Sequence, residues 1–169
     1  ASFDIAKAAL MAADFAVTSP SNLVYDGKEK RAEVNAQSYI NGSGEITVKY
    51  YDSYGNELSS APIDAGEYTV KIDVTEGENY EEARDLAAEI WQFTITQAVN
   101  AVNNLTISGW IYGDPAHTPT AAAAFGEISY KYIDTVTNEE SLTAPVAAGN
   151  YKVIATVAET ANYAAASAE

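Results

Sequence analysis

The chain has 169 residues and a net charge of −15, from 24 acidic and 9 basic residues, and it contains no cysteine. This charge would repel a phosphate backbone and an anionic membrane surface, so we expect no nucleic-acid partner. No apolar run approaches the roughly 20 residues of a membrane span, so we expect no membrane insertion. The lack of cysteine excludes disulfides, thiol catalysis and cysteine-zinc sites.

Residues 1–13 carry two conflicting signals. The run AKAALMAA favours a helix, whereas Phe3-Asp4-Ile5 alternates apolar and polar side chains as a strand does. The motif F-x-I-x-x-A of residues 3–8 returns at residues 93–98. We therefore interpret residues 3–5 as a strand, and residues 1–8 resemble the end of a preceding repeat.

The rest of the chain contains two equivalent halves. Each begins with a short strand, at residues 14–17 and 104–107, and continues with a strand and a Gly-containing turn, at residues 23–27 and 110–114. Alternating strands are predicted at residues 46–50 and 128–132. Residues 61–80 and 144–163 then match at a constant spacing. A constant spacing indicates an internal repeat.

One strand of this repeat has a clear apolar face. Because side chains alternate along a strand, every second residue from position 68 or 151 onward points to the same side. The members of this face are Tyr68, Val70, Ile72 and Val74 in the first copy, and Tyr151, Val153, Ala155 and Val157 in the second. We expect this to be the central strand of each half.

The two halves end differently. Residues 81–89 fit a helical turn or an irregular connection, and Trp91, Phe93 and Ile95 then form a closing strand. Nothing after Tyr163 resembles W-x-F-x-I, so we expect the second half to lack its last strand. An open sheet edge is a template for strand addition. We therefore expect weak head-to-tail self-association, with residues 3–5 of one chain near the open edge of another.

A short motif at the start of the central strand is more specific. Residues 64–70 resemble the D-x-G-x-Y-x-C signature of immunoglobulin-like domains, in which the Tyr forms a tyrosine corner. Val70 stands where that signature has its Cys, and in the second copy Ala147 replaces the Asp. The expected corner residues are Asp64, Gly66, Tyr68, Gly149 and Tyr151.

Short alternating strands separated by turns, in modules of about 80 residues, favour antiparallel β-sandwiches. The predicted fold is therefore all-β. It consists of two tandem immunoglobulin-like antiparallel β-sandwich modules, residues 1–96 and 97–169, with the second lacking its last strand.

The order of the motifs resembles the bacterial immunoglobulin-like repeats called MBG domains. The matching motifs are F-x-I-x-K-A at residues 3–8, Tyr-Gly-Asp at 112–114, A-G-x-Y-x-V at 65–70 and 148–153, and Asn-Tyr at 79–80 and 162–163. The resemblance implies an extracellular or cell-surface location in a large bacterial protein. It also implies neighbouring repeats of the same chain as partners, and no catalytic residues.

Residues that could carry chemistry are sparse. His117 is the single histidine, so neither a transition-metal site nor a His-dependent triad can be assembled. Calcium is the one cofactor candidate, because loop carboxylates are frequent, but residues 52–57 lack the alternating ligands of a calcium loop. We expect no enzyme, and no catalytic, cofactor-binding or metal-binding residues.

Aromatic residues are the remaining candidates for recognition. Trp110, Tyr51 and Tyr54 could be exposed, and aromatic side chains are common on binding surfaces. Because nothing converges on a site, we expect a non-catalytic spacer or stalk module of a bacterial cell-surface or secreted, adhesin-like protein. The alternative is a ligand-binding module for carbohydrate or a host extracellular protein.

Overall fold

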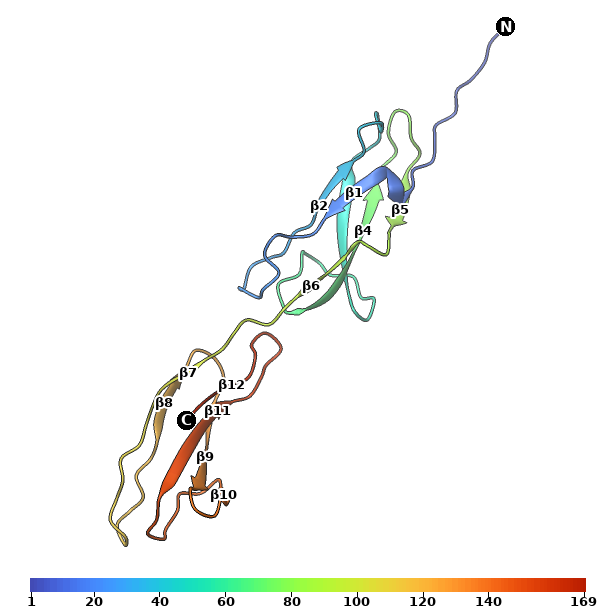
Figure 1. Ribbon diagram of the computed structural model, residues 1–169. Coiled ribbons are helices and arrows are strands. Elements are labelled where there is room, and N and C mark those ends of the chain that lie inside the picture. Colours follow the sequence, from blue (N-terminus) through green and yellow to red (C-terminus); the bar gives the residue numbers. More distant parts are fainter. The chain divides into compact units, whose positions relative to one another are not determined.

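The computed structural model describes residues 1–169 and divides into two compact units, Ala1–Thr96 and Gln97–Glu169 (Figure 1). Both units are built from antiparallel sheets, and none of the sheets closes into a barrel. The all-β prediction, with antiparallel sandwich-type modules, is confirmed. No helix of the structure has the length and apolar character needed to cross a membrane.

Unit 1 contains two sheets. A short 3-10 helix, η1 (Ala12–Asp14), leads into β1 (Phe15–Thr18), which pairs with β2 (Glu33–Ala36). The second sheet is formed by β3 (Ile46–Asp52), β4 (Gly66–Val74), β5 (Ala83–Leu86) and β6 (Gln92–Ile95). Strand β3 pairs with one edge of β4, while β5 and β6 pair with successive parts of its other edge.

The core of unit 1 lies on the inner face of β4. Val70, Ile72 and Val74 are at most 1% exposed, as the alternation along this strand predicts. Strand β6 completes the core, because Trp91 beside it and Phe93 and Ile95 within it are all buried. Full burial of one such side chain stabilises a fold by about 1.5–3 kcal/mol, so β4 and β6 dominate the packing of this unit.

Unit 2 repeats this plan. Strand β7 (Val102–Thr106) pairs with β8 (Thr120–Ala123), and the larger sheet contains β9 (Ile128–Asp134), β10 (Glu140–Ser141), β11 (Tyr151–Val157) and β12 (Ala166–Ala168). The register is also repeated, since Tyr50 lies opposite Val70 and Tyr132 opposite Val153. The main buried cluster is smaller and consists of Val102, Ala155 and Val157.

The second unit lacks a counterpart of β6. Strand β12 corresponds to β5, because Ala166 pairs with Val157 as Ala83 pairs with Val74. No strand pairs with residues 151–154 on the edge of β11 away from β9. Residues 97–169 thus contain no strand in the position of β6, and half of this edge is unpaired within them.

Three local predictions were wrong. Residues 3–5 are extended but have no partner strand, so they are not a strand in this chain. Residues 81–89 contain the strand β5 rather than a helical turn or an irregular connection, because pairing with β4 overrides helix propensity. The strands expected near residues 24 and 111 reduce to one isolated bridge, between Val24 and Thr96.

Candidate functional site

Both predicted corners are formed by a tyrosine hydroxyl and a main-chain oxygen. The Tyr68 hydroxyl donates to the carbonyl oxygen of Asp64 at 2.9 Å, and the Tyr151 hydroxyl donates to that of Ala147 at 3.2 Å. The acceptor is main chain in both units, so the loss of the Asp side chain at position 147 leaves the bond in place. Burial raises the pKa of Tyr68, because it disfavours the phenolate. Each bond joins residues four positions apart in the same segment and offers no reactive group.

The glycines at the corners make room for the tyrosine rings. A Cβ added to Gly66 would come 3.2 Å from the Tyr68 hydroxyl oxygen, and one added to Gly149 would come 3.1 Å from that of Tyr151. Both distances are below ordinary van der Waals contact. Gly66 and Gly149 therefore belong to the packing of the corner, together with the tyrosines.

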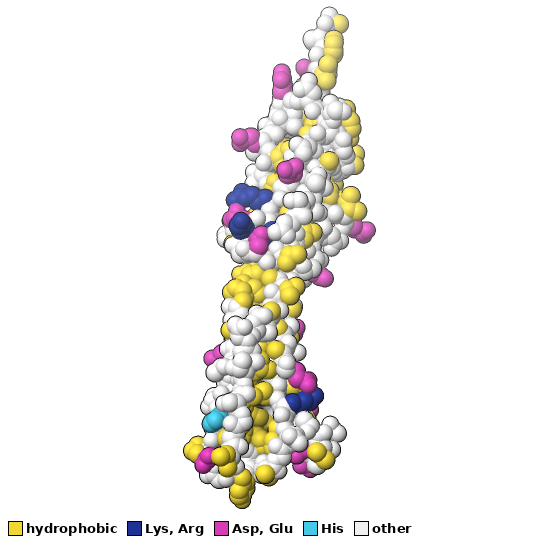
Figure 2. Space-filling view, turned by 60° about the vertical axis from the view of Figure 1, so that its left-hand side comes forward, with side chains coloured by type: hydrophobic (Ala, Val, Ile, Leu, Met, Phe, Trp, Pro, Cys, Tyr) yellow, Lys and Arg dark blue, Asp and Glu magenta, His cyan; other side chains and the backbone are white.

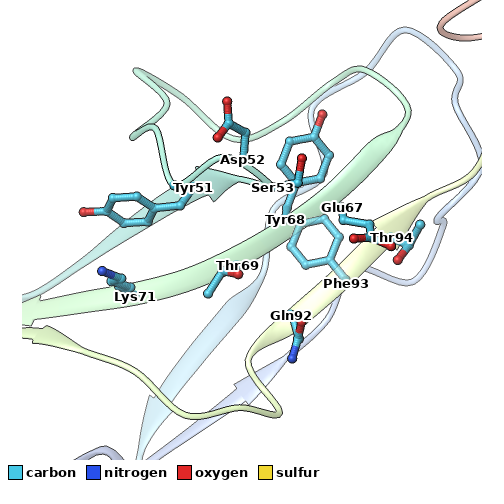
Figure 3. A pocket seen from close by; sticks show the side chains of 11 residues that line it. Tyr51, Asp52, Ser53, Glu67, Tyr68, Thr69, Lys71, Gln92, Phe93 and Thr94 are labelled. Atoms are coloured by element: carbon cyan, nitrogen blue, oxygen red, sulfur yellow. The ribbon is translucent and has the colours of Figure 1, made fainter.

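A cavity of about 600 Å³ in unit 1 lies beside the corner on the sheet of β3, β4 and β6. Figure 3 shows the side chains of Tyr51, Thr69, Lys71 and Gln92 at this surface, with Tyr68 and Phe93 next to each other. The Lys71 ammonium lies 4.4 Å from the centre of the Tyr51 ring, a cation–π contact. The cavity thus combines an aromatic face, a cation and an amide.

The Tyr51 hydroxyl is held by acidic groups. It donates to Glu57 at 2.9 Å and lies 3.3 Å from an Asp85 oxygen. Burial and the Glu57 carboxylate raise the pKa of Tyr51 to about 12, because both disfavour a phenolate. A neutral phenol cannot serve as a base at neutral pH, so we assign this residue no proton-transfer chemistry.

Carboxylates in the hairpin loops are already paired with N–H groups. Asp52 accepts bonds from the main chain of Tyr54 and from both the main chain and the side-chain amide of Asn56. These donors, the Asn56 amide first, lower the pKa of Asp52. Asp134 accepts the main-chain N–H groups of residues 136 and 137 in the equivalent loop. Both loops are closed by their own aspartate, as turns of this kind commonly are.

The structure forms no group of three or more His, Cys, Asp or Glu side chains able to hold a metal ion. Figure 2 shows the Asp and Glu side chains dispersed over the visible face rather than gathered in one patch. His117 bonds to Ser108 in an exposed loop and lies 5.9 Å from the Trp110 ring. Calcium, the one cofactor candidate of the sequence analysis, is thus given no site by these residues.

The three candidate recognition aromatics do not form one cluster. Tyr54 is 89% exposed at the tip of its hairpin, whereas Tyr51 is half-buried under Lys71. Trp110, half-buried, belongs to unit 2 and lines a different cavity. Lys71 and Gln92 were missed by the sequence analysis, because polar side chains on the outer face of a strand carry no signal of their own.

Comparison with known proteins gives one match. Residues 112–169 match the family model described as MBG domain, which confirms the resemblance stated from the motifs. MBG domains occur in surface and secreted proteins and are a structural, non-enzymatic type of repeat. No curated protein and no solved structure matches the chain.

Proposed function

We propose that this chain is a non-catalytic spacer or stalk portion of a large bacterial cell-surface or secreted protein, of the adhesin-like kind. The MBG match at residues 112–169 carries the proposal. The first unit supports it, because its strands repeat those of the matched unit with the same register. A repeated domain with the same fold is what a spacer built from tandem modules requires.

The chemistry of the surface supports the same function. The loop carboxylates Asp52 and Asp134 bond within their own turns, and the Tyr51 hydroxyl is held by Glu57. The one buried cation, the Lys30 ammonium, is paired with Asp26 at 2.6 Å, and this pairing lowers the pKa of Asp26. An active site needs perturbed groups left available to a substrate. The engagement of these side chains by partners in their own unit favours a structural function.

The location can be tested by protease shaving of intact cells of the source organism. Trypsin cleaves after Arg31 and Lys49, so residues 32–49 would be released as one peptide and identified by mass spectrometry. We expect this peptide from intact cells or from the culture medium. Its appearance only after lysis would contradict the proposal. A peptide from an abundant cytoplasmic protein serves as the control for leakage.

A ligand-binding function is the second candidate, and the cavity beside Tyr51 favours it. An aromatic face next to a cation and an amide is an arrangement that can stack on and hydrogen-bond to a sugar. The test is a glycan and extracellular-matrix array, with and without calcium. A ligand specific to the cavity would bind the wild type and be lost with Gln92→Ala or Lys71→Ala. The exposed Tyr54→Ala change, outside the cavity lining, is the matched control.

A further inference from the structure

The loop between β2 and β3 contains an Asn-Gly pair at residues 41–42. Asn41 is the one asparagine of the chain that a glycine follows. Its side chain is exposed, and Gly42 has a φ of 80°. Glycine adopts this left-handed conformation without strain, because it has no Cβ. The same lack of a side chain leaves the Gly42 nitrogen unshielded, so the Asn41 side chain can approach it.

The hydrogen bonds of the loop leave these two groups free. The Asn41 carbonyl oxygen accepts from the side-chain amide of Asn79 at 3.0 Å, and the Gly42 carbonyl oxygen accepts from the Asn79 N–H at 3.0 Å. Neither the Gly42 N–H nor the Asn41 side-chain amide takes part in a hydrogen bond within the protein. The main chain of the pair is therefore held in place, while its nucleophilic nitrogen and its electrophilic amide carbon stay available.

We propose that Asn41 is a site of spontaneous covalent modification, at which the side-chain amide becomes a carboxylate through a cyclic imide. The Gly42 nitrogen attacks Cγ of Asn41, and the side-chain nitrogen leaves as ammonia with the proton of the Gly42 N–H. Water then opens the ring. Cleavage of the bond from nitrogen to Cγ gives aspartate. Cleavage of the bond from nitrogen to the main-chain carbonyl carbon gives isoaspartate, in which the chain runs through the side chain.

Other asparagines of the chain lack this combination of features. Asn35 lies within β2, where it pairs with Ala16, and is followed by an alanine. The Asn56 side chain donates to Asp52. In unit 2 the loop before β9 has alanines at residues 123–124, the positions that correspond to the Asn-Gly pair when the common Gly-Glu-Ile is aligned. The proposed modification therefore belongs to unit 1 alone.

The loop packs closely against the segment that follows β4. A Cβ added to Gly42 would come 2.6 Å from Nδ2 of Asn79, and one added to Gly44 would come 2.1 Å from the carbonyl oxygen of Thr75. On the opposite segment, a Cβ added to Gly77 would come 2.3 Å from the Gly42 carbonyl oxygen. Isoaspartate lengthens the main chain between residues 41 and 42 by the Cβ atom. Close packing leaves no room for this atom, so the loop must move away from residues 75–79.

Asn79 connects this loop to the beginning of the unit. Its carbonyl oxygen accepts from the Ala8 N–H at 3.0 Å, while its own N–H and side chain hold residues 41–42. Displacement of the loop breaks both bonds that Asn79 donates. The effect should remain local, because the buried side chains of β4 and β6 lie outside these segments. The inference stands independently of the proposed function.

The first test follows the tryptic peptide of residues 32–49 by mass spectrometry after incubation at neutral and mildly alkaline pH. Conversion at Asn41 should be faster at the higher pH, because the attacking nitrogen must lose its proton. Electron-transfer fragmentation identifies isoaspartate, and a sample taken at time zero corrects for conversion during digestion. Asn35 in the same peptide is the internal control and should stay unconverted. The Asn41→Gln variant keeps an exposed amide but needs a larger ring, so it should show no conversion at this position.

The second test measures hydrogen exchange after chromatographic separation of the isoaspartyl form. This form should lose protection at the Asn79 N–H and keep it in β4 and β6. Asn41→Asp, measured before ageing, is the matched control. It adds the same charge without lengthening the main chain, so it should exchange as the unmodified protein does.

The proposal is overturned by a wild type whose Asn41 stays unconverted at alkaline pH, or by equal conversion of Asn35 and Asn41. It is equally overturned by an isoaspartyl form in which the Asn79 N–H remains as protected as in the unmodified protein.

Discussion

The hydroxyl of Tyr151 donates to the carbonyl oxygen of Ala147, four residues earlier, just as the hydroxyl of Tyr68 donates to that of Asp64. The first corner is the more buried, since Tyr68 is 9% exposed and Tyr151 is half-buried. A buried hydrogen bond contributes more when its loss leaves the acceptor without water. The two corners therefore share one hydrogen-bond pattern, but the bond of Tyr68 contributes more to stability than the bond of Tyr151.

Replacing Tyr68 with Phe is expected to lower the free energy of unfolding by about 1 kcal/mol, because it leaves the Asp64 carbonyl oxygen without its donor. Tyr151→Phe should cost less, because water can reach its acceptor. Urea denaturation at neutral pH measures both. Tyr54→Phe, at a fully exposed hydroxyl, is the control and should be neutral. Equal stability of the Tyr68→Phe variant and the wild type would contradict the assignment of a corner.

Ile72→Ala should destabilise unit 1 by about 2–5 kcal/mol, the usual cost of deleting a fully buried large side chain. Ile72 is 0% exposed in the centre of β4. Hydrogen exchange followed by mass spectrometry should show the loss of protection in β3, β4 and β5. Ile90→Ala, at an 84% exposed position of the same unit, is the control and should leave exchange unchanged.

The ion pair of Lys49 and Asp73, 2.6 Å apart on neighbouring strands, predicts a pH dependence of stability. The Lys49 ammonium lowers the pKa of Asp73, which also accepts the Asp85 N–H. A carboxyl whose pKa is depressed by folding stabilises the fold above its unfolded pKa of about 4, and this contribution is lost as the pH falls through the folded value. The Asp73→Asn variant should show a weaker loss of unfolding free energy on acidification than the wild type. Glu127→Gln, which removes one exposed charge, is the control and should leave the pH dependence of the unfolding free energy unchanged.

The raised pKa of Tyr51 predicts a loss of stability at alkaline pH. Burial and Glu57 raise its pKa to about 12, so its contribution to stability is present below the unfolded pKa of about 10 and is lost as the pH rises through the folded value. Ultraviolet difference spectra of the wild type and Tyr51→Phe should place the appearance of its phenolate absorption above the ordinary tyrosine pKa of about 10. Glu57→Gln should shift the Tyr51 transition to lower pH. A Tyr51 titration at an ordinary pKa would refute this account of its surroundings.

Periodicity was enough to predict β3, β4, β9 and β11, because their inner faces are apolar at every second position. It failed at β5, where Ala83 and Leu86 flank a left-handed Asp85, with φ of 52°, that accommodates a register shift against β4. A tertiary pairing of this kind leaves no pattern in four residues. The cavity beside Tyr51 could not be predicted from the sequence either, because its lining comes from three strands whose register only the fold defines.

The main-chain acceptors at positions 64 and 147 have an evolutionary consequence. Because the corner bond uses no side-chain atom at that position, mutation can change the charge there without touching the bond. Asp64 and Ala147 already differ by one charge while their tyrosines keep the same partner atom. Duplicated copies of this module can therefore diverge in surface charge and still inherit the same turn.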